Sequence, residues 1–215
     1  MTKDWLDAGF KPAVRKNALW YIICILAYPL LTVVMLIIGN IYAVSSISEF
    51  SVTSYLKTFL TALPVFLVFS IFEEFGWRGY LVPKLASTGI NDFLGYAIVA
   101  VVWASWHLPY IRELSWVYTS DSLATFFPRF HLSMFAFSIL YSEVRIITGS
   151  VWPAVLMHCI SNSFAHPLLA DYVKITQGKE YLISSTGLIM TACIGLLGII
   201  LNRWRVKNEA LLRME

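Results

Sequence analysis

Long apolar stretches alternate with short polar ones along this chain, a pattern typical of membrane-spanning helices. An α-helix needs about 20 consecutive, mostly apolar residues to cross a bilayer. The pattern predicts six spans, at about residues 18–44, 55–78, 93–107, 131–148, 152–166 and 181–201, with the end of the second left open. Two polar stretches, 112–129 and 171–180, are expected to be loops. The predicted fold class is therefore all-α, a polytopic transmembrane helical bundle of about six spans.

The composition agrees with a membrane protein. Hydrophobic residues make up 58% of the 215 residues and charged residues only 13%, whereas soluble domains contain about 25% charged residues. We expect one domain over residues 1–215, with a polar, interfacial lead-in at 1–17, a membrane core at 18–202 and a basic tail at 203–215. The first apolar run exceeds the about 7–15 residues of a signal-peptide core, so we expect it to be retained as a span.

Basic residues flank the two ends of the predicted membrane core. Lys3, Lys11, Arg15 and Lys16 precede it, and Arg203, Arg205, Lys207 and Arg213 follow it. The positive-inside rule then places both termini in the cytoplasm, which requires an even number of spans. These clusters are short and next to apolar segments, so they do not indicate nucleic-acid binding. We expect a multi-pass integral membrane protein of a bacterial or archaeal plasma membrane, in contact with membrane lipid.

Polar residues lie inside the predicted helices at helical spacing. The three fragments contain Glu73, Glu74 and Arg78; Trp103 and His107; and His158 and Asn162. An ionised side chain at the centre of a membrane helix costs on the order of 2.5–3.5 kcal/mol on insertion scales. Residues that are so unfavourable for membrane insertion are better explained by chemistry than by stability.

The first fragment predicts a division of labour between its two acids. Glu74 and Arg78 are four residues apart, so they share a helix face and can form an ion pair. Glu73 is rotated by about 100° from Glu74 and is expected to point elsewhere. The alternative is that both acids serve the ion pair as a packing device.

The two histidine fragments each have an ordinary explanation when taken alone. A single histidine on an apolar helix is usually a hydrogen-bonded core residue, and His158 with Asn162 can link helices within a membrane. Taken together, polar groups on three separate helices indicate a shared site. One difficulty is depth, because Glu73, His107 and His158 meet only if the second helix continues past Arg78 or the third span starts deeper in the bilayer.

These fragments, in this order and spacing, resemble the CAAX-processing and bacteriocin-processing (CPBP) intramembrane proteases, which include the eukaryotic CAAX prenyl endopeptidases. The resemblance covers about residues 72–162. It implies that Glu73 is the catalytic glutamate and that His107 helps it to activate water. It further implies that His158 and Asn162 stabilise the oxyanion, with Glu74, Arg78 and Trp103 as supporting residues. Trp103 occupies a position where the family usually has phenylalanine, a change expected to alter packing rather than chemistry.

The same residues admit a zinc alternative. Glu73, His107 and His158 form a plausible ligand set with one position left for water, and zinc would lower the pKa of that water. The chain lacks the HExxH motif, and the ion pair with Arg78 occupies Glu74, the remaining base. We therefore favour a mechanism without a metal or other cofactor.

The expected function is that of an intramembrane endopeptidase acting on a membrane-associated peptide or protein. The substrate is expected to be either a prenylated, CAAX-type protein or a bacteriocin-like peptide. Two alternatives from other classes are a non-proteolytic membrane scaffold of the same fold and a small transporter with Glu73 and the histidines as a proton relay. A transporter is expected to show internal symmetry, which this sequence lacks. The oligomeric state is not predicted.

Two further sets of residues have simpler interpretations. Glu143 and Arg145, near the end of the fourth predicted span, are expected to reach the membrane interface. Cys24, Cys159 and Cys193 lie in apolar stretches without a CxxC pair and are expected to be small core residues.

Overall fold

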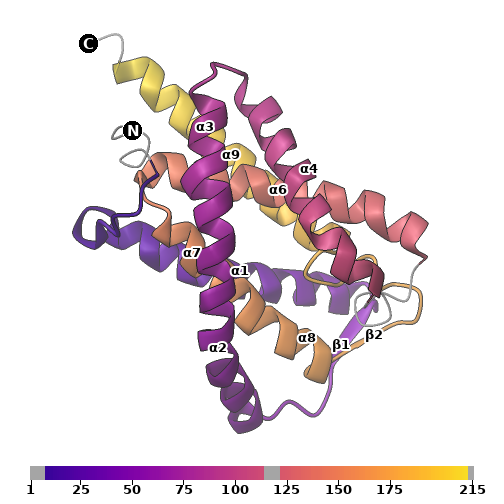
Figure 1. The fold of residues 1–215 in the computed structure, drawn as a ribbon. Coiled ribbons are helices and arrows are strands. Elements are labelled where there is room, and N and C mark those ends of the chain that lie inside the picture. The colour runs from indigo at the N-terminus through magenta and orange to yellow at the C-terminus, as the bar shows by residue number, and fades with distance from the viewer. Residues whose placement is uncertain (1–7, 114–121, 213–215) are drawn as a thin grey trace.

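A computed structural model describes residues 8–113 and 122–212 of the chain. The polypeptide is mainly helical (Figure 1). Its elements are α1 (Val14–Ile41), β1 (Ser45–Ile47), α2 (Val52–Glu74), the π-helical segment η1 (Phe75–Leu81), α3 (Val82–Ala86), α4 (Asp92–Glu113), α6 (Leu123–Thr148), α7 (Trp152–Ile160), the π-helical segment η2 (Ser161–Ala165), α8 (His166–Tyr172), β2 (Val173–Ile175) and α9 (Leu188–Leu212). The prediction of an all-α transmembrane bundle is confirmed.

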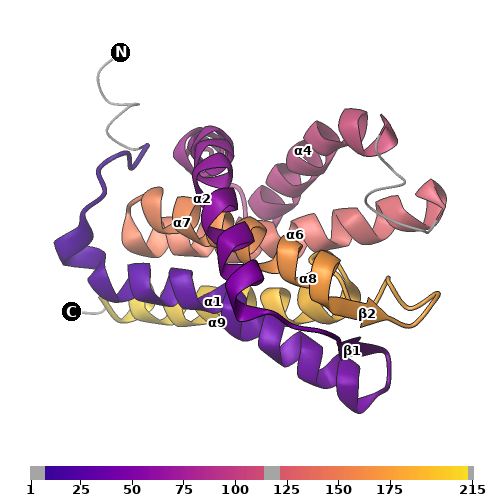
Figure 2. The ribbon, with the colours of Figure 1, turned by 90° about the horizontal axis from the view of Figure 1, so that it is seen from below.

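Helix α6 lies at the centre of the bundle, and α4 and α9 pack against it. Helix α7 lies between α1 and α2, and it contacts both. Seen from below, α1 and α9 form a layer beneath α6 and α7, with α2 and α4 on the opposite side (Figure 2). The start of α1 and the end of α9 lie on the same side of the bundle. The cytoplasmic location of the two termini stays a prediction.

Four helical segments within the described residues are long and apolar enough to cross a membrane. They are Val14–Ile41, Val52–Ala86, Leu123–Thr148 and Leu188–Glu209. The other two predicted spans correspond to α4 and to the broken helix made of α7, η2 and α8. Neither of these two helices is both as long and as apolar as the four segments above. The total of six spans therefore stays a prediction.

Several predicted boundaries were wrong because proline did not end the helices. Helix α4 continues through Pro109 to Glu113 instead of ending at residue 107. The helix that begins at Trp152 continues past Pro167 to Tyr172. Inside a bundle, neighbouring groups and local changes of helical pitch satisfy the backbone groups that proline frees. The predicted loop 112–129 is also shorter, since α6 already begins at Leu123, and residues 114–121 lie outside the described part of the chain.

The sixth predicted span is shifted along the sequence. Helix α9 starts at Leu188 rather than near residue 181, and it includes residues of the predicted basic tail as far as Leu212. Loop segments 45–54 and 171–180 also contain an unpredicted two-stranded ribbon, in which β1 and β2 pair antiparallel with Ser46 opposite Lys174. This pairing joins segments about 130 residues apart, which local sequence patterns do not reveal.

Residues 8–13 of the lead-in pack onto the bundle, and the interfacial location of the lead-in stays a prediction. The carbonyl of Gly9 accepts a hydrogen bond from the Val151 amide at 2.9 Å, and that of Phe10 accepts one from the Trp152 indole at 2.8 Å. Gly9 has a φ of 70°, and a Cβ there would lie 2.6 Å from the Arg145 guanidinium. Glycine is therefore required both by the backbone conformation and by the close approach.

Glu143 and Arg145 are buried inside the bundle, whereas side chains that extend to the membrane interface were expected. Glu143 is fully buried and Arg145 is 8% exposed. Two residues along a helix rotate the side chain by about 200°, so the two point to opposite sides of α6. Arg145 faces η1, and Glu143 faces α9, where Arg205 contacts it through Nε at 2.7 Å.

Glu143 is the centre of a buried polar cluster that joins α4, α6 and α9. Its carboxylate also accepts hydrogen bonds from Tyr96 and, at 2.8 Å, from Asn202. Arg205 makes a second ion pair with Asp92 at the start of α4. These partners explain why a glutamate is tolerated inside the bundle, because each buried charge has an opposite charge and further hydrogen bonds.

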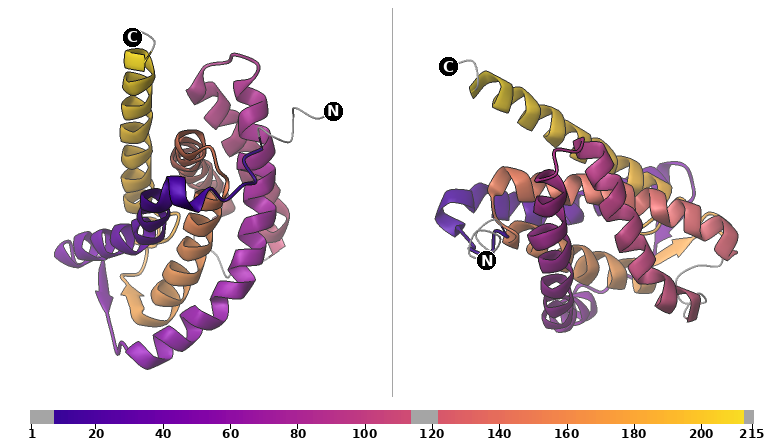
Figure 3. Two further views of the ribbon diagram at one scale, coloured as in Figure 1. Left: turned by 90° about the vertical axis from the view of Figure 1, so that its left-hand side faces the viewer. Right: turned by 45° about the horizontal axis from the view of Figure 1, so that its top comes forward.

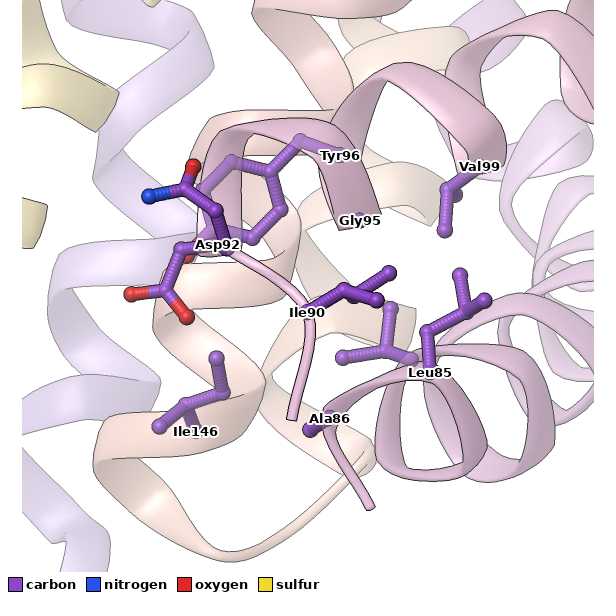
Figure 4. Close-up of a pocket in the computed structure, with 10 residues that line it drawn as sticks. Leu85, Ala86, Ile90, Asp92, Gly95, Tyr96, Val99 and Ile146 are labelled. Atoms are coloured by element: carbon purple, nitrogen blue, oxygen red, sulfur yellow. The ribbon is translucent and has the colours of Figure 1, made fainter. Parts of the chain in front are cut away.

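A small pocket adjoins this cluster at the turn between α3 and α4 (Figure 4). Leu85, Ile90 and Val99 line its apolar side, and the Asp92 carboxylate points away from them. Its volume of about 20 Å³ suffices for a single water molecule. The pocket is therefore too small to hold a peptide.

The Glu143 cluster predicts a large effect of removing Arg205. Arg205→Ala would leave the Glu143 carboxylate buried without its cation, and we expect it to lower the free energy of unfolding by about 3–5 kcal/mol. The measurement is unfolding in mixed detergent micelles, followed by circular dichroism. The control is Arg203→Ala, an exposed position on the same helix, with an expected change within about 0.5 kcal/mol. Equal effects at the two positions would contradict a role for the buried ion pair.

Candidate active site

The helix that carries Glu73, Glu74 and Arg78 does not stop after Arg78. Helix α2 passes through η1 into α3, giving one continuous rod that ends at Ala86 and is visibly bowed (Figure 3). The sequence left two ways for Glu73, His107 and His158 to meet, a longer second helix or a deeper start of the third span. The structure has the longer second helix.

Both π-helical segments end two residues before a proline. Segment η1 ends at Leu81, before Pro83, and η2 ends at Ala165, before Pro167. Proline lacks an N–H and its ring crowds the carbonyl four residues earlier, so a wider turn ahead of it relieves the clash. Single π turns inside helices are frequent at functional sites.

The π turn in η1 changes the bonding of the Arg78 carbonyl. The Val82 amide bonds to the carbonyl of Trp77, five residues back, and Pro83 has no amide to offer to Arg78. The Arg145 side chain on α6 supplies the bond, with Nε donating to the Arg78 oxygen at 3.1 Å. A buried carbonyl is thereby satisfied by a side chain from another helix.

Glu74 and Arg78 form the predicted ion pair, and both side chains are completely buried. Arg78 Nη1 lies 3.2 Å from Glu74 Oε1, and His158 Nδ1 on α7 lies 2.8 Å from the same oxygen. A carboxylate oxygen only accepts, so the Nδ1 of His158 carries the proton. Glu74 therefore fixes the orientation of the His158 ring and leaves Nε2 facing away.

Aromatic rings enclose the Arg78 guanidinium. Its carbon lies 4.2 Å from the centre of the Trp103 ring and 4.8 Å from that of Tyr141. Such cation–π contacts gain strength when the cation is removed from water. The edge of the His158 ring also meets Trp103 and Tyr141, with centroid distances of 5.8 and 5.9 Å.

Glu73 points away from the ion pair, as the rotation along the helix predicted. Its Oε2 accepts a hydrogen bond of 2.7 Å from the indole nitrogen of Trp103, and the side chain is half-buried. The prediction that Trp103 affects only packing was incomplete, because its N–H contacts the carboxylate directly.

His107 lies one helical turn after Trp103 on α4. Its Nδ1 is 2.7 Å from the Trp103 carbonyl, which fixes Nδ1 as the donor because a carbonyl oxygen only accepts. The ring centroids of the two residues are 6.2 Å apart, and His107 is within range of electrostatic interaction with both Glu73 and His158. The structure therefore gathers Glu73, His107 and His158 around one indole ring.

Asn162 is the one residue of the predicted set that is not joined to this group. It lies half-buried in η2, and its side-chain amide has no hydrogen bond to another described residue. The role of Asn162 in the site therefore stays a prediction.

A family described as type II CAAX prenyl endopeptidase, Rce1-like, matches residues 55–164, just over half of the chain. This chain belongs to the Rce1-like family. The match extends from the first turn of α2 into η2, so it includes all seven residues of the predicted site. No curated protein and no solved structure matches the chain significantly. The chain is thus an integral membrane protein of a protease family, as the resemblance implied.

The structure adds residues to the site of this Rce1-like protein that sequence reasoning missed. Tyr141 stacks on Arg78, and Arg145 bonds to the backbone of Arg78. Tyr141 lies in an apolar helix where nothing in the spacing distinguished it from a core aromatic residue. For Arg145 a signal existed, since it is a charged residue inside an otherwise apolar helical stretch.

The zinc alternative requires Glu73, His107 and His158 to lie close together. Within the described residues, no group of three or more His, Cys, Asp or Glu side chains lies close enough to hold a metal ion. The nearest candidates are also engaged elsewhere, Glu73 with Trp103 and His158 with Glu74. The mechanism without a metal, and the zinc alternative with Glu73, His107 and His158, both stay predictions for this Rce1-like protein.

The Glu74–Arg78 pair predicts strong energetic coupling. Glu74→Gln and Arg78→Met each leave a buried charge without its partner, and we expect each to lower the free energy of unfolding by about 3–5 kcal/mol. In the double variant, the free energy of unfolding is expected to fall by clearly less than the sum of the two single effects. The measurement is unfolding of the two single variants and the double variant in mixed micelles. The control is Lys57→Met, at an exposed position of α2. Additive losses would show that the two charges do not depend on each other.

Proposed function

We propose that this chain is an intramembrane endopeptidase that hydrolyses a peptide bond with a water molecule activated by Glu73. The observation that supports this proposal is the different environment of the two adjacent acids. Arg78 and His158 both contact the Glu74 carboxylate, whereas Glu73 forms no ion pair with a described residue. Trp103 holds Glu73 beside His107. An acid kept apart from the ion pair is suited to accept a proton.

In the proposed reaction, the Glu73 carboxylate takes a proton from water as the water oxygen attacks the carbonyl carbon of the substrate. The tetrahedral intermediate then collapses, the carbon–nitrogen bond breaks, and the proton passes to the leaving amine. His107 assists through Nε2, which accepts a hydrogen bond in the neutral ring because Nδ1 donates to Trp103. His107 is thus proposed to orient the water rather than to carry charge.

His158 is proposed to stabilise the oxyanion. Since its Nδ1 already donates to Glu74, Nε2 is a donor only in the imidazolium form. Donors placed where negative charge develops contribute strongly in a site that excludes water. The Asn162 amide, one turn further along the same helix, is proposed as a second donor.

The proposed substrate class is a membrane-associated peptide or protein. The family description names CAAX prenyl endopeptidases, so a prenylated peptide is the first choice, and a bacteriocin-like peptide without a prenyl group is the second. Membrane lipid is the proposed surrounding partner, and no cofactor is invoked. We further propose a bacterial or archaeal plasma membrane as its location.

Replacement of Glu73 tests the proposal. Glu73→Gln keeps the shape and the acceptor for Trp103 but removes the base, so we expect cleavage to fall by about 100- to 10,000-fold. The measurement is hydrolysis by the purified protein in detergent of matched prenylated and unprenylated peptides, with and without a chelator. Glu49→Gln, an exposed acid, is the control and is expected to cleave like the wild type.

The chelator arm separates the alternatives. Cleavage that resists the chelator and is lost in Glu73→Gln supports the glutamate mechanism. Cleavage that a chelator abolishes and zinc restores would favour the metalloprotease alternative with Glu73, His107 and His158. Absence of cleavage of every peptide by the wild type would favour a non-proteolytic scaffold.

A further inference from the structure

Trp103 contacts three residues of the candidate site through three different parts of its structure. The indole N–H donates to Glu73 Oε2 at 2.7 Å, the ring face covers the Arg78 guanidinium at 4.2 Å, and the backbone oxygen lies 2.7 Å from His107 Nδ1. These contacts place the base, the buried cation and the histidine around one side chain.

The ring of Trp103 has little freedom to move. The residue is 3% exposed, and Phe137 and Tyr141 on α6 meet its ring with centroid distances of 6.2 and 6.0 Å. A donor on a rigid ring fixes its acceptor better than one on a flexible side chain, since less conformational entropy is lost on binding. The position of the indole nitrogen therefore determines where the Glu73 carboxylate lies.

The hydrogen bond uses only one of the two carboxylate oxygens. Trp103 binds Oε2, and no hydrogen bond to a described residue uses Oε1 of Glu73. The half-buried carboxylate thus presents Oε1 in a defined direction. Phenylalanine would fill part of the same space against Arg78 and Tyr141 but has no N–H, so the carboxylate would lose this restraint.

We propose that Trp103 is a positioning residue whose indole N–H aims the Glu73 carboxylate at the attacking water. This inference rests on the proposed function, because it assumes that Glu73 activates water. The role differs from packing, since it depends on one hydrogen atom rather than on the volume of the ring. Well-oriented catalytic groups contribute strongly to rate, and small displacements are costly.

Removal of the N–H without a change of shape is the decisive experiment. In one variant, 3-benzothienylalanine replaces Trp103, so that sulfur stands in place of the N–H, and in a second Trp103→Phe removes it together with part of the ring. Both are measured for kcat, KM and thermal unfolding with the prenylated peptide. We expect kcat to fall about tenfold to 100-fold in both, with KM within about twofold of wild type.

The matched control is the same pair of replacements at Trp106. That tryptophan is on the same helix and 61% exposed, and its ring meets Trp77 outside the site at 6.5 Å. We expect kcat and KM to stay within about twofold of wild type there. A similar fall at the two positions would overturn the proposal.

Two results at position 103 would overturn the inference. One is a wild-type kcat in the benzothienyl variant, whatever Trp103→Phe does, because the ring alone would then suffice. The other is a change confined to KM, which would indicate a role in binding. If Trp103→Phe fails to fold, the benzothienyl variant decides alone. Failure of the proposed function is distinct, since it requires a wild type that does not cleave or a Glu73→Gln variant that does.

Discussion

The buried ion pair between Glu74 and Arg78 is the interaction on which the site depends. Neither charge is stable alone in the interior of a membrane protein, so each needs the other and further contacts. Arg78 obtains them from the faces of Trp103 and Tyr141, and Glu74 from His158. These contacts draw α2, α4, α6 and α7 together at one point, and they leave Glu73, the adjacent acid, available to a different partner.

Helix α6 connects this point with the rest of the bundle. Tyr141 and Arg145 on one face contact the side chain and the backbone of Arg78, while Glu143 on the opposite face binds Arg205 of α9. The same short segment therefore supports the site and anchors the last helix. Residues 8–13 cover the Arg145 side of this arrangement, through hydrogen bonds to the start of α7.

The two interrupted helices at the site share one feature. Pro83 and Pro167 each follow a π turn, and the π turns lie directly after Glu74 and after the His158 turn. A carbonyl freed in this way is costly in an apolar interior unless a donor reaches it. Arg145 provides that donor at Arg78, so a change of helical pitch and a buried arginine occur together.

Local spacing along the chain was sufficient to predict the membrane class, the helical fold, the Glu74–Arg78 pair and the separate direction of Glu73, because these follow from composition and from the 100° rotation per residue. It was not sufficient to predict that the helices continue through Pro83, Pro109 and Pro167, since proline is tolerated when other helices satisfy the freed groups. Nor did it predict the bond from Trp103 to Glu73, the enclosure of Arg78 by Tyr141, or the burial of Glu143 with Arg205. Those contacts join residues about 30 to 65 positions apart, and only packing of the helices decides which of them meet.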